Sequence, residues 1–192
     1  MAKGLSAESI TVAAAELIEQ YGRSGFSMRL LADTMGVKTA SLYNHIENMD
    51  TLLTEVCRYA LRMQEDGELR AIAGKTGREA VWALAWAYRR FAQQHRELYW
   101  LVMDTAAGEP RVLDDAAARF TEPLNQVLSG FRLPPREEIH FRRMFRAIVH
   151  GFASQEDEGF FSHYPVSTEL SFEFAIQRFI DCVLEAEKRN PS

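Results

Sequence analysis

Apolar residues recur every three or four positions along most of the chain, which is the spacing of an amphipathic helix. At the N-terminal end, Ile10, Ala14, Leu17 and Ile18 share one helical face in this way. No segment shows the strict alternation of apolar and polar residues that is typical of a half-buried strand. The pattern therefore predicts an all-α fold.

Helix-capping residues divide the first part of the chain into four expected helices. Ser6, Ser27 and Asn48 have the side-chain oxygen that an N-cap needs, and each precedes an apolar periodic run. Gly22 and Gly36 follow such runs and can adopt the left-handed conformation that ends a helix. The expected helices extend from Ser6 to Gly22, from Ser27 to Met35, from about Lys38 to His45, and from Asn48 to about residue 66.

The remaining chain predicts a body of five helices. A loop with Gly74, Thr76 and Gly77 separates this body from the first part, and proline-containing segments mark three later breaks. The expected helices cover about 77–94, 97–106, 110–130, 135–156 and 167–188. The order is therefore three short helices, a connector helix and a five-helix body.

The segment from Ser27 to Ile46 has the pattern of a helix-turn-helix. Its two short expected helices flank Gly36, which can reverse the chain within a few residues. Ala32 is small where the two helices would cross, and apolar side chains such as Leu42 would fix the crossing angle. One face of the second helix then remains free to enter the major groove of DNA.

This free face carries side chains suited to contacts with DNA. The candidate DNA-binding residues are Arg29, Lys38, Thr39, Ala40, Ser41, Tyr43, Asn44 and His45. Lys38 could donate to guanine or to a phosphate, Asn44 could bond to adenine, and the small side chains between them could touch a thymine methyl group. Tyr43, His45 and Arg29 could bond to phosphates, which position the protein without reading sequence.

The charge of the chain argues against strong non-specific binding to nucleic acid. The net charge of the 192 residues is −5. Between residues 27 and 46 the basic side chains are Arg29 and Lys38, and the acidic side chain of Asp33 opposes them. We therefore expect weak non-specific binding with a shallow salt dependence, so that specific binding depends on a few placed hydrogen bonds.

Over residues 6–56 the sequence resembles the TetR family of transcriptional regulators. The likeness includes Leu31-Ala32, Met35-Gly36-Val37 and the run Leu42-Tyr43-Asn44-His45-Ile46, which ordinary helix-turn-helix proteins lack. The resemblance implies a homodimer whose N-terminal helices read a palindromic operator.

Carried over by position, the same resemblance implies that Lys38 to Ser41 face the bases and that Tyr43 and His45 hold phosphates. Met49 departs from the family, which often has Lys at that position. The phosphate contact of that Lys is therefore in doubt, although the N–H groups at the start of the connector helix could still receive a phosphate.

The expected body is similar to a C-terminal subclass of this family that is named for a Trp-His-Gly triplet. The likeness rests on residues 91–103, on Val149-His150-Gly151-Phe152 and on Gly159-Phe160, with Val149 in the Trp position. The resemblance implies that the body dimerises and binds a small effector.

Aromatic side chains of the body could line an apolar effector cavity. The candidate residues are Trp82, Trp86, Phe91, Trp100, Met103, Phe120, Phe141 and Phe145. The alternative is that these side chains fill the helical core, because aromatic residues at helical spacing usually do.

The last two expected helices carry long apolar stripes, which predict a dimer interface in the form of a four-helix bundle. The candidate interface residues are Ile148, Phe152, Phe172, Ile176, Phe179, Ile180 and Val183. The alternative is that these side chains are buried within one chain.

No motif indicates catalysis, a metal or another cofactor, because a nucleophile motif, a phosphate-binding glycine loop and a zinc pattern are all missing. His140 and His150 would lie about 15 Å apart along one helix, which is too far to share an ion. Cys57 and Cys182 are expected to be reduced residues of the core or an interface. A redox switch would require the two thiols to be close together.

The sequence thus predicts a transcriptional regulator with a DNA-binding domain over 1–50 and a ligand-binding and dimerisation domain over 51–192. We expect a homodimeric repressor that binds double-stranded operator DNA and is released by a small, largely apolar effector. The alternative is a DNA-binding regulator without an effector pocket, controlled by protein partners. No signal peptide or membrane-spanning run is visible, so we expect a cytoplasmic protein without a membrane partner.

Overall fold

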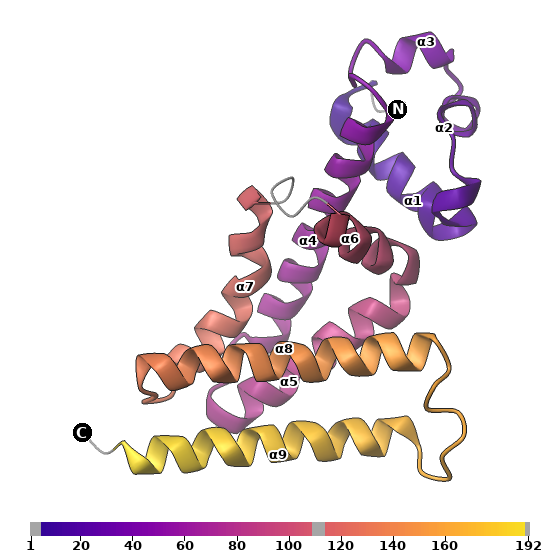
Figure 1. Cartoon of the computed structure of the whole chain (residues 1–192). Coiled ribbons are helices and arrows are strands. Elements are labelled where there is room, and N and C mark those ends of the chain that lie inside the picture. Colours follow the sequence, from indigo (N-terminus) through magenta and orange to yellow (C-terminus); the bar gives the residue numbers. More distant parts are fainter. Residues whose placement is uncertain (1–4, 109–113, 191–192) are drawn as a thin grey trace. The chain divides into compact units, whose positions relative to one another are not determined.

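The computed structural model describes residues 5–108 and 114–190, and the side chains of these residues except 107–120. Within these residues the chain forms nine α-helices and no strand, which confirms the all-α prediction (Figure 1). The helices are α1 (Ala7–Gly25), α2 (Met28–Met35), α3 (Thr39–Leu42), α4 (Met49–Ile72), α5 (Gly77–Gln94), α6 (Arg96–Gly108), α7 (Asp114–Ser129), α8 (Pro135–Asp157) and α9 (Thr168–Arg189).

Most expected helix boundaries agree with the structure to within two residues, but three predictions need correction, and the expected start at residue 110 lies outside the described residues. Helix α1 ends at Gly25 and not at Gly22: Gly22 has a positive φ of 70°, which kinks the helix, and one more turn follows it. Helix α3 has a single turn, and hydrogen-bonded turns replace the expected helix over residues 43–45. Helix α4 continues to Ile72, beyond the expected end near residue 66, because Glu68 and Ile72 are buried and extend its packed face. The chain leaves this helix only at Gly74, which has a φ of 72°.

Contacts divide the chain into two compact units. The first comprises residues 1–63 and 95–119, and the second comprises residues 64–94 and 120–192. Helix α4 therefore contributes residues to both units. In the first unit α1 packs against α2 and α6, and fully buried side chains such as Ile10, Leu31 and Leu42 form the core.

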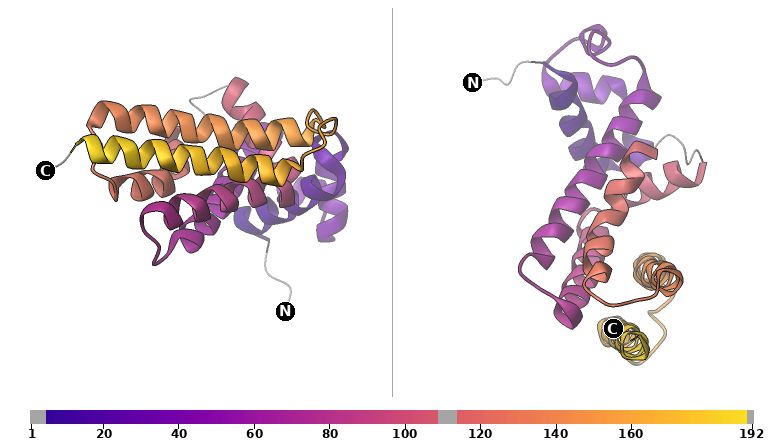
Figure 2. Two further views of the ribbon diagram at one scale, coloured as in Figure 1. Left: turned by 90° about the horizontal axis from the view of Figure 1, so that it is seen from below. Right: turned by 90° about the vertical axis from the view of Figure 1, so that its left-hand side faces the viewer.

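In the second unit α8 and α9 lie side by side in opposite directions, and α5 packs against both (Figures 1 and 2). Aromatic rings fill the space between these helices. The ring of Phe179 meets those of Phe141 and Phe145 edge-on at centroid distances of 5.9 and 5.4 Å. The Trp86 ring meets Phe172 in the same way at 5.4 Å. Such edge-to-face pairs stabilise a core beyond the burial of their area.

A buried ion pair joins α5 to α8 inside this aromatic core. The Arg89 side chain donates from Nε to Oε2 of Glu156 at 2.9 Å, and a second contact joins Nη2 to Oε1. The guanidinium carbon also lies 5.1 Å from the centre of the Trp86 ring and 4.9 Å from that of Phe172. This pairing accounts for a charged side chain that is only 5 % exposed, because a buried charge requires a partner.

Among residues 5–108 and 114–190, none of the helices combines the length and the hydropathy that a membrane span requires.

The two cysteines differ in their surroundings. Cys57 is buried in the first unit, where its Sγ lies 3.4 Å from the Thr105 hydroxyl, and burial raises the pKa of its thiol. Cys182 is exposed on α9. The expectation of a core or interface position therefore holds within the chain for Cys57, whereas Cys182 lies on the surface.

Candidate nucleic-acid interface

Helix α2 begins at a side-chain cap and is held by one buried face. The Ser27 hydroxyl accepts a hydrogen bond from the Leu30 N–H at 3.2 Å, as the sequence predicts. Met28, Leu31 and Ala32 are buried. The cap satisfies an N–H group that has no partner within the helix, and the apolar face fixes the orientation of the helix.

The turn after α2 depends on a left-handed glycine. Gly36 has φ 67° and ψ 30°, and its N–H donates to the Asp33 carbonyl at 3.2 Å. The Val37 N–H donates to the Ala32 carbonyl at 3.0 Å, which completes a Schellman motif. A Cβ atom on Gly36 would meet no atom within 4 Å, so glycine is needed here for its φ angle and not for space.

The segment after this turn exposes one side and buries the other. Leu42 is fully buried and Ile46 is 7 % exposed, so these two side chains anchor the segment. The amide groups of His45 and Ile46 both donate to the Leu42 carbonyl, at 2.9 and 3.1 Å, which keeps residues 43–46 compact after the single turn of α3.

All eight predicted DNA-binding residues retain accessible surface. Thr39 and Ser41 are half-exposed, and the other six are exposed, namely Arg29, Lys38, Ala40, Tyr43, Asn44 and His45. They come from α2, α3 and the turns that flank α3, which lie next to each other in the first unit (Figure 1). Hydrogen-bonding side chains are therefore exposed on one side of the segment, while Leu42 and Ile46 anchor its other side in the core. Binding in a DNA groove requires such an arrangement.

The charge of this surface is modest. Nε of Arg29 lies 3.8 Å from Oδ2 of Asp33 on the next turn of α2, and both side chains are largely exposed. Such a pair contributes little to stability, but it offsets part of the positive charge that would attract DNA.

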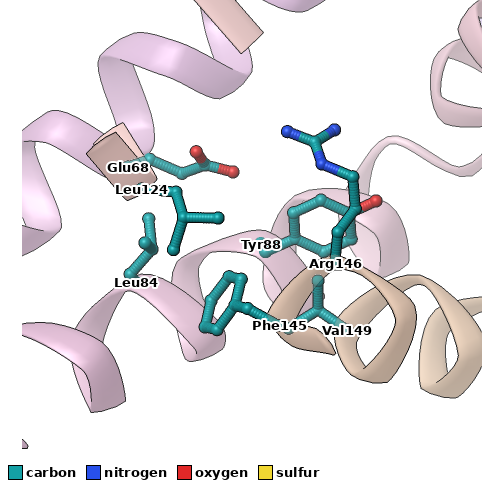
Figure 3. Close-up of a pocket in the computed structure, with 7 residues that line it drawn as sticks. All are labelled: Glu68, Leu84, Tyr88, Leu124, Phe145, Arg146 and Val149. Carbon is teal, nitrogen blue, oxygen red and sulfur yellow. The ribbon is translucent and has the colours of Figure 1, made fainter. Parts of the chain in front are cut away.

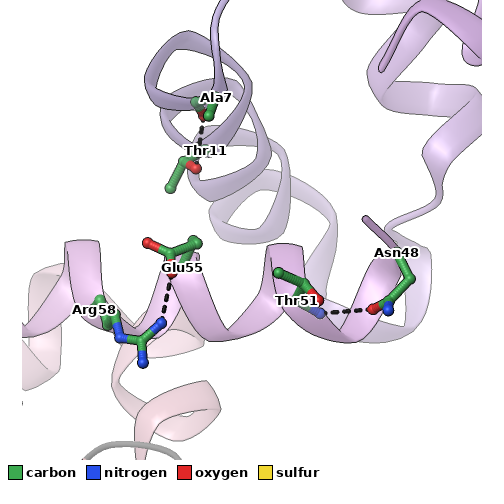
Figure 4. Close-up of polar contacts among 6 residues, drawn as sticks. All are labelled: Ala7, Thr11, Asn48, Thr51, Glu55 and Arg58. Atoms are coloured by element: carbon green, nitrogen blue, oxygen red, sulfur yellow. Dashed lines mark hydrogen bonds and ion pairs between the residues drawn. The ribbon is translucent and has the colours of Figure 1, made fainter. Parts of the chain in front are cut away.

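The N-terminus of α4 belongs to the same unit and is capped as the sequence predicts. Oδ1 of Asn48 accepts from the Thr51 N–H at 2.8 Å (Figure 4). Met49, where a Lys would add a cation, is half-exposed at the first helical position. Further along the same helix, Arg58 pairs with Glu55 (Figure 4).

A contact between α1 and α6 joins two segments of the first unit, and sequence reasoning missed it. The carboxylate of Glu19 accepts from the Leu98 N–H in the first turn of α6, and its Oε1 lies 3.4 Å from Nδ1 of His95. Burial raises the pKa of Glu19, while His95 and the Leu98 N–H act in the opposite direction. A Cβ at Gly22, where φ is 70°, would lie 3.3 Å from the Glu97 carboxylate. No local sequence pattern could have predicted this contact, because the two segments lie about 75 residues apart in the chain.

The residues predicted to line an effector cavity are divided between the two units. In the second unit a small cavity is lined by Glu68, Leu84, Tyr88, Leu124, Phe145, Arg146 and Val149 (Figure 3). Of the eight predicted lining residues, Phe145 is in this set. Trp86 and Phe141 pack against the aromatic core, Phe91 is buried, and Trp82 is half-buried.

Three predicted lining residues lie elsewhere. Trp100 and Met103 belong to α6 in the first unit, where the Trp100 ring meets Tyr99 at 5.5 Å. The side chain of Phe120 lies outside the described residues. Helical spacing could not distinguish residues that line a cavity from residues that fill the core, because both kinds recur with the same helical period.

The predicted interface residues are mostly core residues of one chain. Phe172, Ile176, Phe179, Ile180 and Val183 are at most 1 % exposed within the single chain. They have no surface left to offer a second copy, and burial within one chain, the alternative interpretation, accounts for them. Ile148 and Phe152 are half-buried.

Two histidines lie on α8 and differ in exposure. No group of three or more His, Cys, Asp or Glu residues that could hold a metal ion occurs in the described part of the chain. His150 is half-buried on α8, and burial together with the charge of Arg146 lowers its pKa. His140 is exposed on the same helix.

These features define a helix-turn-helix DNA-binding protein. Residues 10–56 match the family described as bacterial regulatory proteins, tetR family. Residues 81–179 match the tetracyclin repressor-like, C-terminal domain. The chain belongs to the TetR family of transcriptional regulators, which is not a family of enzymes.

One relative is similar in sequence, and two solved structures are similar in fold. An uncharacterized HTH-type transcriptional regulator of Bacillus subtilis is 28% identical over 184 residues, which cover 94% of each chain. A solved structure of unknown function from Rhodococcus sp. RHA1 has a TM-score of 0.79 at 21% identity, covering 94% of this chain and 96% of that one. A TetR variant from Acinetobacter baumannii has a TM-score of 0.68 at 19% identity, covering 98% and 100%. The two solved structures support the fold.

Proposed function

We propose that the protein is a homodimeric, ligand-responsive repressor that binds a palindromic operator through residues 27–46. The observation that carries the proposal is the exposed face around α3, where Lys38, Tyr43, Asn44 and His45 are accessible while Leu42 and Ile46 anchor the segment. A DNA-binding domain over 1–50 and a ligand-binding and dimerisation domain over 51–192 are part of this proposal. So is its action in the cytoplasm, where its operator would be accessible.

The test begins with selection of DNA from a random duplex library by the full-length protein, followed by fluorescence anisotropy on the selected site. Tyr43→Phe removes one hydroxyl group, and the loss of a hydrogen bond to a phosphate should weaken binding about tenfold. Tyr21→Phe is the matched control, because Tyr21 and Tyr43 are both 50% exposed and Tyr21 lies on α1. Equal DNA affinities of the two variants would show that the Tyr43 hydroxyl group makes no contact with DNA.

Salt dependence separates phosphate contacts from base contacts. If Lys38 contacts a phosphate, Lys38→Ala should reduce the slope of log affinity against log salt by about one and weaken all sequences alike. If it contacts a base, the variant should instead relax the selected sequence at one position per half-site. Selection of sites without two related half-sites would contradict the proposed palindrome.

The dimer proposal rests on apolar side chains that remain exposed on the second unit. Leu170 and Phe174 are 58% and 66% exposed, and they lie one turn apart on α9. Residues four positions apart share a helix face, so together they present an apolar surface that a second copy could cover. The proposed interface therefore contains Leu170 and Phe174 in place of the five buried residues Phe172, Ile176, Phe179, Ile180 and Val183. Ile148 and Phe152 contribute to it through the part of each side chain that is exposed.

The proposed ligand response uses the small cavity and α4. Glu68, which lines the cavity, belongs to the same uninterrupted helix as the residues that follow the Asn48 cap in the DNA-binding unit. A ligand that displaces α4 would change the separation of two recognition segments, which must match successive major grooves about 34–36 Å apart. The A. baumannii variant was solved in complex with minocycline, which supports the proposal that this fold can hold a small effector. The likeness to the Trp-His-Gly subclass, with Val149 lining the cavity, is part of the proposal.

A second candidate is a regulator without an effector pocket, controlled by protein partners. Two observations favour it: of the predicted lining residues whose side chains the structure describes, only Phe145 lines the small cavity, and the segment between α8 and α9 exposes Phe160, Tyr164 and Val166. Addition of ligands to the protein–operator complex decides between the two candidates. Release by a small molecule supports the first candidate, and release only by a second protein supports the alternative.

A further inference from the structure

A second pocket lies at the end of the second unit where the chain passes from α8 to α9. Figure 1 shows this connection at the right-hand ends of the two helices. The pocket has a volume of about 230 Å³, is partly open to solvent, and shares no lining residue with the small cavity around Glu68. All of its lining residues belong to the second unit, and they are Phe152, Phe161, Tyr164, Val166, Thr168 and Ser171.

Local hydrogen bonds hold the segment that forms the pocket wall. Gly159 has a φ of 74° where the chain leaves α8, and its carbonyl accepts from the Ser162 hydroxyl group at 2.7 Å. At the start of α9 the Ser167 hydroxyl group accepts from the Leu170 N–H at 3.3 Å. The chain itself therefore sets the shape of the wall, so that a ligand does not have to order it on binding.

Two aromatic rings form the apolar side of the pocket. Phe152 and Phe161 are half-buried, and their ring centres lie 5.4 Å apart at an angle of 55°. The Phe152 ring also meets Phe172 edge-on at 5.3 Å, which joins this side of the pocket to the aromatic core. Aromatic rings attract a further ring in an offset or edge-on geometry, so these two rings favour an aromatic ligand over an aliphatic one.

The polar groups of the lining side chains are three hydroxyl groups. Those of Thr168 and Ser171 belong to half-buried residues, whereas Tyr164 is 69% exposed and lies at the mouth. Within residues 5–108 and 114–190, none of the three hydroxyl groups has a hydrogen-bonding partner in the chain. None of the described residues that line the pocket is charged, so an ion would lose hydration here without gaining an opposite charge. The lining therefore favours a neutral ligand whose polar group can both donate and accept.

The volume of the pocket limits the ligand to about one ring. Drug-sized ligands usually occupy cavities of about 300–1,000 Å³. An apolar cavity of about 150 Å³ is sufficient to bind benzene. At about 230 Å³ the pocket has room for a single ring with one or two small substituents.

We propose that this pocket binds a small neutral phenol. The ring of the ligand lies against Phe152 and Phe161, and its hydroxyl group forms hydrogen bonds with Thr168 and Ser171. This binding site is separate from the small cavity that the proposed ligand response uses, and binding at it requires neither DNA nor that response.

The experiment is fluorine NMR of para-fluorophenol with the full-length protein, without DNA. At about pH 7 a phenol is neutral, because its pKa is about 10. Binding broadens the fluorine signal, and a competitor that displaces the probe restores the narrow line. We expect para-methylphenol to displace the probe. Toluene lacks the hydroxyl group and should require an about tenfold higher concentration. Cyclohexanol lacks the aromatic ring and should be about threefold weaker than para-methylphenol or more. Benzoate is ionised and should not displace the probe.

Substitutions identify the hydroxyl contacts and the position of the site. Thr168→Val combined with Ser171→Ala removes both hydroxyl groups with little change of shape. Affinity for para-fluorophenol should then fall about tenfold, while that for toluene stays the same. Ser154→Ala is the matched control, because Ser154 is a half-buried serine of α8 that does not line the pocket. Ser171→Phe places a ring in the pocket and should abolish binding of the probe.

Four results would overturn the proposal: equal displacement by toluene and para-methylphenol, displacement by benzoate at the same concentration, binding of the probe that persists in Ser171→Phe, or no binding to the parent protein. If the probe does not bind and Ser171→Phe dissociates the protein in sedimentation, a second copy covers the pocket instead. Circular dichroism distinguishes loss of binding from loss of folding, and the double variant decides if Ser171→Phe does not fold. If the probe binds as expected but the operator complex persists in its presence, the assigned site stands and the effector of the proposed repressor binds elsewhere.

Discussion

The DNA-binding segment and the aromatic core of the second unit are held together over very different sequence distances. From Ser27 to Ile46 the decisive hydrogen bonds join residues three to five positions apart, at the cap, at Gly36 and around Leu42. In the second unit Arg89 pairs with Glu156, 67 positions away. A recognition surface can thus be specified locally, while the body that carries it depends on distant partners.

This difference has an energetic consequence. Removing a cap costs about 1 kcal/mol, whereas truncating a buried aromatic side chain, or removing one partner of a buried ion pair, costs about 3–5 kcal/mol. Substitutions in the body should therefore reduce global stability, and substitutions in the recognition segment should act mainly on DNA affinity. The predictions below test that contrast, starting with the largest expected effect.

Phe179→Ala should destabilise the protein by about 3–5 kcal/mol, because it removes a ring that is 1 % exposed and packs against two other rings. Urea unfolding at fixed protein concentration measures this loss. Phe174→Ala on the same helix is the comparison: its ring is 66% exposed, so stability within one chain should change little while self-association weakens.

Phe179→Ala and Phe174→Ala together also show which side chains of α9 belong to the core and which to a dimer interface. Sedimentation of Phe174→Ala should show dissociation at concentrations where the parent protein stays associated. If Phe179→Ala instead leaves the unfolding midpoint unchanged and only dissociates the protein, the side chain belongs to an interface and the core assignment is wrong.

Glu156→Gln should cost about 3 kcal/mol, because it leaves the buried Arg89 guanidinium without its carboxylate. The corresponding change in the recognition segment is Asp33→Asn, which breaks the exposed pair with Arg29 and should cost less than about 0.5 kcal/mol. Chemical denaturation of both variants measures the contrast. Similar losses for the two would show that burial of the pair does not matter.

Stability should depend on pH through Glu68. Its folded pKa of about 7 lies above the ordinary 4.5, so its contribution is full below pH 4.5 and is lost as pH rises through 7. Between about pH 5.5 and pH 8 the loss should be about 2 kcal/mol. Glu68→Gln should remove this loss, so that the variant gains on the parent protein as pH rises. An unchanged difference between the two across this range would exclude a raised pKa.

The success of sequence reasoning followed the same division between local and distant contacts. The caps at Ser6, Ser27 and Asn48 and the left-handed Gly36 were predicted, since each depends on residues within one helical turn. Gly22 also adopts a positive φ, although one more turn of helix follows it before α1 ends at Gly25. The all-α fold follows from periodicity alone.

The cavity and the partners of buried charges were not predictable in this way. Phe141 and Phe145 share the same apolar period and both pack against Phe179, yet Phe145 also lines the cavity and Phe141 does not. Glu68 looks like an ordinary polar position of α4 until α5, α7 and α8 are placed around it. Periodicity identifies which face is buried, and only the assembled helices decide what each buried side chain meets.

Ser27→Ala should have the smallest effect on stability, about 1 kcal/mol, because it removes the hydroxyl group that accepts from the Leu30 N–H. Ser27→Gly is the matched variant: glycine is tolerated at an N-cap, so its cost should be only about a few tenths of a kcal/mol. Hydrogen exchange of the Leu30 amide reports the local opening, and anisotropy on the selected DNA reports its consequence for binding. We expect exchange and DNA affinity to change together in Ser27→Ala while the unfolding of the second unit, followed through Trp82 and Trp86, stays as in the parent protein. A parallel loss in both units would show that the cap is coupled to the body, and the contrast between local and distant stabilisation would not hold.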